Sequence, residues 1–171
     1  MATTVSVPVS EAISRIPDPE VPVVTIADLG ILRDVQVDEE ARTVTVTITP
    51  TYSGCPAMEA IAARVDFEAR ALGYAVSVRT RLSPAWTTDW VTEAGRDKLR
   101  RFGIVPPGPA GPVRSAGPAG PVPVELGRHV VACPHCGSTD TTEISHFGST
   151  ACKALRRCEA CREPFDEFKA L

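Results

Sequence analysis

The chain has 171 residues, enough for one ordinary domain with a small module beside it and too few for a large multi-domain enzyme. Hydrophobic residues make up 43% and charged residues 23%, as in folded soluble proteins, so global disorder is excluded. The formal net charge is −3 and no segment is strongly basic, which disfavours a protein that binds nucleic acid.

The N-terminal residues lack the basic start and long apolar region of a signal peptide, and no apolar run is long enough to cross a membrane. We therefore expect a cytoplasmic protein with no membrane contact. Because thiols stay reduced in the cytosol, the six cysteines are better explained as metal ligands or a reactive thiol than as three disulfides.

The predicted elements begin with a short helix at 11–16, capped by Ser10 and ended by the prolines that follow it. Apolar residues at every second position then predict two strands, 31–37 and 43–49, which pair most simply as an antiparallel hairpin. Over 56–72 the apolar period becomes helical, with a proline at its start and Gly73 at its stop.

A third strand is predicted at 74–82, and a further helix at 93–102 with Thr92 as its cap. Together these elements predict an α+β domain, a small mixed or antiparallel sheet with helices packed on it. We assign residues 1–105 to this domain.

Residues 106–123 form the clearest break in composition, because proline and glycine fill 11 of the 18 positions. Such a stretch is typical of an extended, semi-rigid linker. It separates a part with one cysteine from a C-terminal part, 124–171, with five.

The C-terminal part contains two Cys-x-x-Cys pairs, Cys133 with Cys136 and Cys158 with Cys161. Each pair can form a knuckle, and two knuckles brought together supply the four sulfurs of a structural Zn²⁺ site. This spacing predicts a zinc ribbon over 124–171, with a redox-active or iron-binding four-cysteine site as the alternative.

Segments 141–147 and 154–158 can serve as the strands of that ribbon. Cys152 is a fifth thiol close to the second knuckle, either a buried small residue or an auxiliary thiol that exchanges metal or contacts a partner. His135 and His146 are expected on the polar surface, because four cysteines already complete the shell.

Cys55 is the only cysteine of residues 1–105 and lies between a predicted strand and the start of the next helix. The positive potential of a helix start lowers the pKa of a thiol, which favours a nucleophile or a soft-metal ligand. A buried structural cysteine fits the position equally well. All three histidines lie beyond the linker, so a Cys-His hydrolase is disfavoured, although Asp28 and Glu59 are nearby in sequence.

The strings DPEVPVVTIADLGILRDV (18–35) and VTVTITPTYSGCPAM (44–58) resemble the metal-sulfur cluster assembly family that includes the SufT and PaaD proteins. Residues 86–107 and 147–171 are most similar to the PaaD members, which belong to the phenylacetyl-CoA epoxidase system of aerobic phenylacetate degradation.

This resemblance implies an accessory protein, not an enzyme, that matures the multicomponent epoxidase by delivering or assembling iron or an iron-sulfur cluster. It implies a reactive thiol at Cys55, an acidic turn containing Asp28, and zinc knuckles at the four paired cysteines. Any iron or cluster carried at a single thiol is expected to be transient, or shared across a homodimer.

The partners implied are the epoxidase subunits, especially an iron-sulfur reductase component, and other iron-sulfur assembly proteins. The competing hypothesis is a structural adaptor, in which the zinc ribbon and the tryptophans dock partner subunits without transferring metal. A nucleic-acid-binding ribbon and a cysteine-nucleophile enzyme are weaker alternatives, because basic charge and a nearby histidine are missing.

Overall fold

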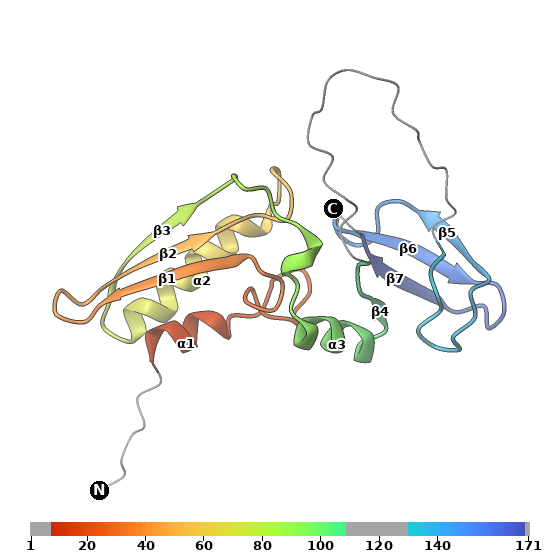
Figure 1. Cartoon of the computed structure of the whole chain (residues 1–171), viewed down its shortest axis with the longest axis horizontal. Helices are drawn as coiled ribbons and strands as arrows, with labels where there is room; N and C mark the ends of the chain where they lie inside the picture. The colour runs from red at the N-terminus through yellow and green to blue at the C-terminus, as the bar shows by residue number, and fades with distance from the viewer. Residues whose placement is uncertain (1–7, 109–129, 170–171) are drawn as a thin grey trace, which may run out of the picture. The chain divides into compact units, whose positions relative to one another are not determined.

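The computed structural model describes residues 8–108 and 130–169, and the chain divides into two compact units after Phe102 (Figure 1). Most of the predicted linker, residues 109–123, lies outside the described part of the chain. The domain limits drawn from composition therefore stay a prediction.

The first helix, α1 (Val9–Ser14), begins earlier than the sequence indicated. Ser10 was expected to cap it, and this expectation is wrong, because Ser10 lies inside the helix and Pro8 precedes it. The carbonyl of Pro8 accepts hydrogen bonds from the N–H groups of Glu11 and Ala12, both 3.0 Å long. The earlier start brings Val9 into the helix, where it is buried together with Ile13.

The first unit is built on a three-stranded sheet in the order β1-β2-β3. Its strands are β1 (Leu32–Asp38), β2 (Thr43–Ile48) and β3 (Ala75–Thr80). The predicted hairpin is confirmed, since β1 and β2 are antiparallel, whereas β3 runs parallel to β2. A parallel neighbour requires a crossover, and α2 (Ala57–Ala71) supplies it.

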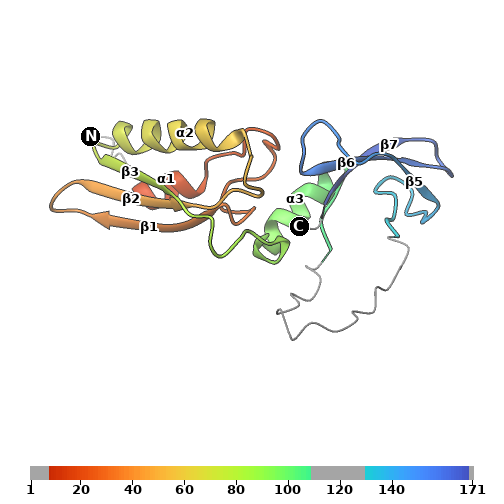
Figure 2. The same cartoon turned by 90° about the horizontal axis from the view of Figure 1, so that it is seen from above.

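The core of this unit follows from the alternation along β2, where Val44, Val46 and Ile48 are buried and the threonines between them are more exposed. Helices α1 and α2 contact each other, α1 also contacts β1, and α2 contacts β3 (Figure 2). The turn at the end of α2 contains Gly73, whose φ of 82° is the left-handed conformation expected of a helix stop.

A single-turn 3-10 helix, η1 (Thr88–Trp90), leads into α3 (Glu93–Arg101). The predicted cap is confirmed, because the Thr92 hydroxyl accepts a hydrogen bond of 3.0 Å from the N–H of Gly95. Trp86 is buried, and its indole N–H donates to the Leu29 carbonyl at 2.9 Å. The Arg33 guanidinium lies 3.5 Å from the centre of the Trp90 ring, so both tryptophans pack within the fold.

The second unit contains a four-stranded sheet in the order β4-β7-β6-β5. Its strands are β4 (Ile104–Val105), β5 (Thr141–Ser145), β6 (Lys153–Cys158) and β7 (Pro164–Phe168). The two expected ribbon strands are present as β5 and β6, and they pair antiparallel. Strands β4 and β7 were not expected.

The molecule is thus a mixed α+β protein, a three-stranded sheet with helices followed by a four-stranded sheet that carries four cysteines. In the part of the chain that the structure covers, no helix combines the length and apolarity that a membrane crossing requires.

Candidate functional site

The four paired cysteines of the second unit converge on one point. Their sulfur atoms all lie within 4.8 Å of one another, and within the described residues this is the one group of three or more metal-ligating side chains so arranged. The Cys133 and Cys161 sulfurs are 3.7 Å apart, and those of Cys136 and Cys158 are 3.5 Å apart.

The two knuckles have the same backbone design. In each, the residue after the second cysteine has a left-handed φ, 75° at Gly137 and 69° at Arg162, and its N–H donates to the first cysteine's carbonyl. A further backbone N–H points to the first sulfur, 3.4 Å from His135 to Cys133 and 3.5 Å from Cys161 to Cys158. Such N–H groups stabilise thiolates.

This donor set fits Zn²⁺. Tetrahedral zinc with Zn–S bonds of about 2.3 Å places its sulfurs about 3.8 Å apart, close to the separations seen here. The first cysteine of each knuckle also belongs to a small apolar core, in which Cys133 and Cys158 pack with Val131 and Phe165. The thiols are therefore held in place by packing as well as by the knuckles.

Without a bound cation, the thiols of this cluster differ in pKa. The backbone N–H of Cys161 helps to hold the pKa of Cys158 at about 7. The Glu163 N–H lowers the pKa of Cys161, but desolvation and the neighbouring thiols outweigh it and raise that pKa to about 12. A divalent cation that neutralises the thiolates would release these protons, so metal binding should strengthen as the pH rises.

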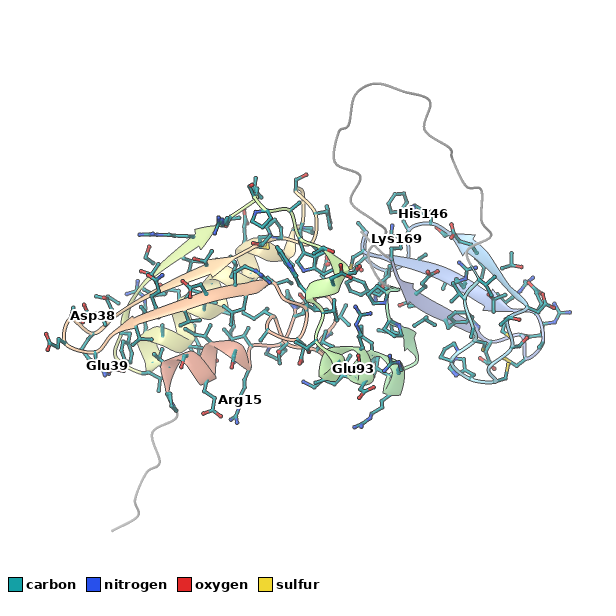
Figure 3. The ribbon with its side chains drawn as sticks, viewed as in Figure 1. Arg15, Asp38, Glu39, Glu93, His146 and Lys169 are labelled. Carbon is teal, nitrogen blue, oxygen red and sulfur yellow. The ribbon has the colours of Figure 1, made fainter. Side chains whose placement is uncertain are left out.

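Two other residues singled out from the sequence, Cys152 and His146, are not among the four ligands that converge. Cys152 is buried just before β6, whereas Cys158 ends that strand, about 20 Å further along it. The Cys152 sulfur lies 3.1 Å from the Thr150 hydroxyl and is not among the four that converge, so an auxiliary role for it stays a prediction. His146 and Lys169 lie at the surface, where Lys169 donates to the His146 carbonyl at 3.0 Å (Figure 3).

Cys55 lies where the sequence indicated, between β2 and α2, and its side chain is half-buried. Its N–H donates to the Tyr52 carbonyl at 3.1 Å, which closes the turn, and Pro56 then precedes the first residue of α2. The fixed φ of proline favours the helix start immediately after the thiol.

The expected low pKa of Cys55 is wrong. Burial raises the pKa of this thiol, and the carboxylates of Glu20 and Asp18 raise it further. The N–H of Ala57 and the hydroxyl of Thr51 act in the opposite direction and are outweighed. The helix start does supply a donor, but two negative charges and partial burial cancel its effect.

The carboxylates near Cys55 come from the DPE segment, which sequence reasoning did not assign to the site. Asp18 is buried, and one of its oxygens accepts from the N–H groups of Glu20 (2.9 Å) and Val21 (2.8 Å). This turn brings the loop, and Glu20 with it, near the thiol. The signal that could have found these residues is the DPE string itself, which belongs to the motif that carries the resemblance.

A shallow cavity of about 300 Å³ borders this loop. It lies between the loop after α1 and the first turns of α2, and Asp18 forms part of its wall. The remaining lining is mainly apolar, from Ile16, Pro17, Pro19, Pro22, Ala60, Ile61 and Arg64. Asp18 thus lies near the Cys55 thiol and also forms part of the wall of this cavity.

Asp28 binds groups that stabilise the fold. Its carboxylate accepts from the Lys98 ammonium at 2.6 Å and from the Thr25 N–H at 2.8 Å, and its carbonyl accepts from Thr92. Burial alone would raise the pKa of Asp28, but Lys98 and Thr25 hold it below its ordinary value. These contacts join the DLG turn to α3, and none of them involves Cys55.

Two family models match the chain. Residues 7–79 match the iron-sulfur cluster assembly protein family, and residues 118–169 match the PaaD zinc beta ribbon domain. The first range contains Cys55 and the DPE segment, and the second contains all four clustered cysteines.

Individual proteins resemble the chain as well. An Escherichia coli (strain K12) protein, named as a putative subunit of 1,2-phenylacetyl-CoA epoxidase, is 49% identical over 160 residues, which cover 93% of this chain and 89% of that protein. A Bacillus anthracis DUF59 domain of unknown function is 24% identical, with a TM-score of 0.48, over 53% of this chain and 87% of that chain. A Mycobacterium tuberculosis protein described as associated with Fe-S complex assembly and repair is 28% identical, with a TM-score of 0.34, over 60% and 94%.

Proposed function

Since the chain belongs to the PaaD family of phenylacetyl-CoA epoxidase subunits, with an iron-sulfur cluster assembly domain and a PaaD zinc ribbon, we propose that it is a maturation factor. It receives iron or an iron-sulfur cluster from other assembly proteins and delivers it to a component of the epoxidase. The component that needs such a centre most directly is an iron-sulfur reductase. The protein itself is not the catalyst.

The observation that carries this proposal is the position of Cys55. It is the only cysteine of the range matched by the assembly family, it is half-buried at a strand-to-helix junction, and it lies near two carboxylates. A single thiol without a full ligand set suits transient holding better than permanent binding.

The chemistry this site supports is ligand exchange. When a metal cation binds, the Cys55 thiol loses its proton to solvent and forms one metal–sulfur bond, and Glu20 and Asp18 offset the positive charge. A cysteine of the acceptor then replaces Cys55, which takes up a proton again. No oxidant or reductant is consumed in this sequence.

The zinc ribbon has a structural role in this proposal. Its four thiols would complete the tetrahedral shell of a bound zinc ion and leave no open position for a substrate. When bound, zinc would supply folding free energy to a unit too small to be stabilised by its own core. The cargo would therefore be handled in the first unit.

The test is to co-produce the epoxidase components with either the natural chain or Cys55→Ser, and to measure iron in the purified reductase component. We expect the iron content and the epoxidase activity to fall at least fivefold with Cys55→Ser, while one zinc per chain is retained. Glu40→Gln is the control, because Glu40 is exposed in the turn between β1 and β2 and belongs to neither site, so both values should stay unchanged. Unchanged reductase iron with Cys55→Ser would remove the proposal.

A structural adaptor remains the second candidate, favoured by one observation. The ribbon exposes 53% of Ile144 and 64% of Phe147, which lie at and just beyond the edge strand β5. Exposed apolar side chains of this kind mark protein contacts. If Ile144→Ser with Phe147→Ser abolishes co-purification of the epoxidase subunits while Cys55→Ser has no effect, the adaptor is preferred.

A further inference from the structure

Strand β4 belongs to the sheet of the zinc ribbon, although it precedes the proline- and glycine-rich segment in the chain. It pairs parallel to β7, with Ile104 opposite Asp166 and Val105 opposite Glu167. The matched ribbon model begins at residue 118 and therefore does not include this strand.

Both side chains of β4 are used in packing. Val105 packs against the apolar cluster that contains Cys133 and Cys158, two of the four clustered cysteines. Ile104 is only 5% exposed. Since neighbouring residues of a strand point to opposite faces, β4 contributes to both sides of the sheet.

The topology of the chain adds a second point. Residues 104–105 and 131–133, which flank the proline- and glycine-rich segment, both belong to the second unit. The connection between the units is therefore made by Phe102 and Gly103, where the division of the chain falls. Gly103 has a φ of 80°, a conformation that glycine adopts without strain and that lets the chain turn out of α3.

The element before this turn is anchored in the first unit. The N–H of Thr92 and the ammonium of Lys98 both bind Asp28, and Gly95 packs so closely on Asp28 that an added Cβ would lie 2.9 Å from its carbonyl oxygen. The residues that directly follow α3, from Gly103 onward, are thus the first residues of the second unit.

We propose that β4 supports the zinc site: residues 104–105 pair with β7 when zinc is bound, and Val105 strengthens zinc binding by packing against the apolar cluster that contains two of the ligand cysteines. Without zinc the knuckles lose their cross-link, the apolar cluster around Cys133 and Cys158 loosens, and a two-residue strand is too short to stay paired. This inference concerns the ribbon and does not depend on what Cys55 carries.

The first test is hydrogen exchange on the full chain, with zinc and after chelation. We expect the amides of 104–105 to be protected only in the zinc-loaded protein and to lose protection together with β6 and β7, while α2 keeps its protection. Fast exchange at 104–105 in the loaded protein, or slow exchange that survives chelation, would overturn the proposal.

The second test is a zinc competition titration with a chromophoric chelator, again on the full chain. Val105→Ser should weaken zinc binding about tenfold, and the milder Val105→Ala about threefold, because each removes apolar contacts with the cluster that holds Cys133 and Cys158 in place. Phe102→Ser is the matched control, since Phe102 is 65% exposed and should leave the affinity unchanged. Equal affinity of all four proteins would contradict the role of Val105.

Discussion

The surroundings of Cys55 show how one residue combines opposing effects. The helix start donates an N–H, from Ala57, which alone would favour the thiolate. Partial burial and the carboxylates of Glu20 and Asp18 favour the neutral thiol more strongly, so the pKa is raised. The free protein therefore holds this sulfur protonated near neutral pH, which slows its oxidation.

This environment predicts a slow alkylation of Cys55. Because its pKa is raised above the ordinary value, little thiolate exists at pH 7 to 8, and the rate with iodoacetamide should keep increasing at pH values above those of an ordinary cysteine. Glu20→Gln removes one cause of the raised pKa of Cys55. The pKa should therefore fall, and the alkylation rate at pH 8 should increase about threefold. Mass spectrometry of the peptide that contains Cys55 provides the measurement.

Glu59→Gln is the control for this experiment, since it removes a carboxylate from the first turn of α2 that is not among the main causes of the raised Cys55 pKa. If both glutamine variants speed alkylation equally, or if Cys55 reacts fastest below pH 8, the description of the site is wrong.

The sequence indicated where Cys55 lies in the fold but not which charged groups lie near it. The apolar periods on either side of Cys55 located it at a strand-to-helix junction, because such periods are local. The direction of its pKa depends on Asp18 and Glu20, which are more than thirty residues away in sequence and come near through the folding of a loop. No local pattern contains that information.

Among the elements, the DLG turn explains how the first unit joins its last helix. Gly30 has a φ of 69°, and a Cβ added there would lie 2.6 Å from the Cβ of Trp90. The turn thus needs glycine twice, once for its backbone conformation and once for its close approach to η1. Arg33 then covers the Trp90 ring from the start of β1.

Gly30→Ala should accordingly destabilise the first unit by about 2 to 5 kcal/mol, from a left-handed alanine and an overpacked contact. Both tryptophans of the chain lie in this unit, so urea unfolding followed by tryptophan fluorescence reports on it alone. Gly108→Ala, at a glycine with no atom within 4 Å of the added Cβ, should leave the midpoint unchanged. Equal midpoints for Gly30→Ala and the natural chain would refute this role of the turn.

Elements long enough to show an apolar period were predicted well, whereas the two-residue strand β4 was not predicted. Fifteen-residue α2 and the hairpin of β1 with β2 have enough residues for a period to be visible. Strand β4 has two residues, and its pairing with β7 depends on a partner some sixty positions further on. The parallel direction of β3 likewise follows from the crossover through α2, not from the strand's own residues.

At the scale of the whole molecule, the two units differ in what stabilises them. The first has a conventional core, whereas the second surrounds four cysteines with few apolar side chains. A unit of this kind depends on its metal, and the first unit should not.

Chelation should therefore unfold the second unit and spare the first. We expect the far-ultraviolet dichroism of the strands to decrease and to return to its starting value on adding one equivalent of zinc, while the tryptophan fluorescence stays constant throughout. A fluorescence change on chelation would show that the first unit also needs the metal, and an unchanged dichroism would show that the second does not.

The domain limits drawn from composition stay a prediction, and composition did not indicate that a strand precedes the proline- and glycine-rich segment. The density of proline and glycine in 106–123 indicated a linker between domains, whereas the chain divides after Phe102 and β4 already belongs to the second unit. Composition reports where regular structure is disfavoured, and it carries no information on which sheet the flanking residues join. The convergence of the four cysteines, in contrast, was predictable, because two Cys-x-x-Cys knuckles encode their own geometry.

The most direct test of the central claim is transfer of iron from this protein to the metal-free reductase component under anaerobic conditions. The chain is loaded with iron and sulfide and mixed with the acceptor, and the absorption of the acceptor's iron-sulfur centre is recorded over time. We predict that the natural chain and Glu40→Gln restore the centre at the same rate, and that Cys55→Ser restores it at least tenfold more slowly with zinc still bound. Restoration by Cys55→Ser at the natural rate would contradict the claim that Cys55 carries the cargo.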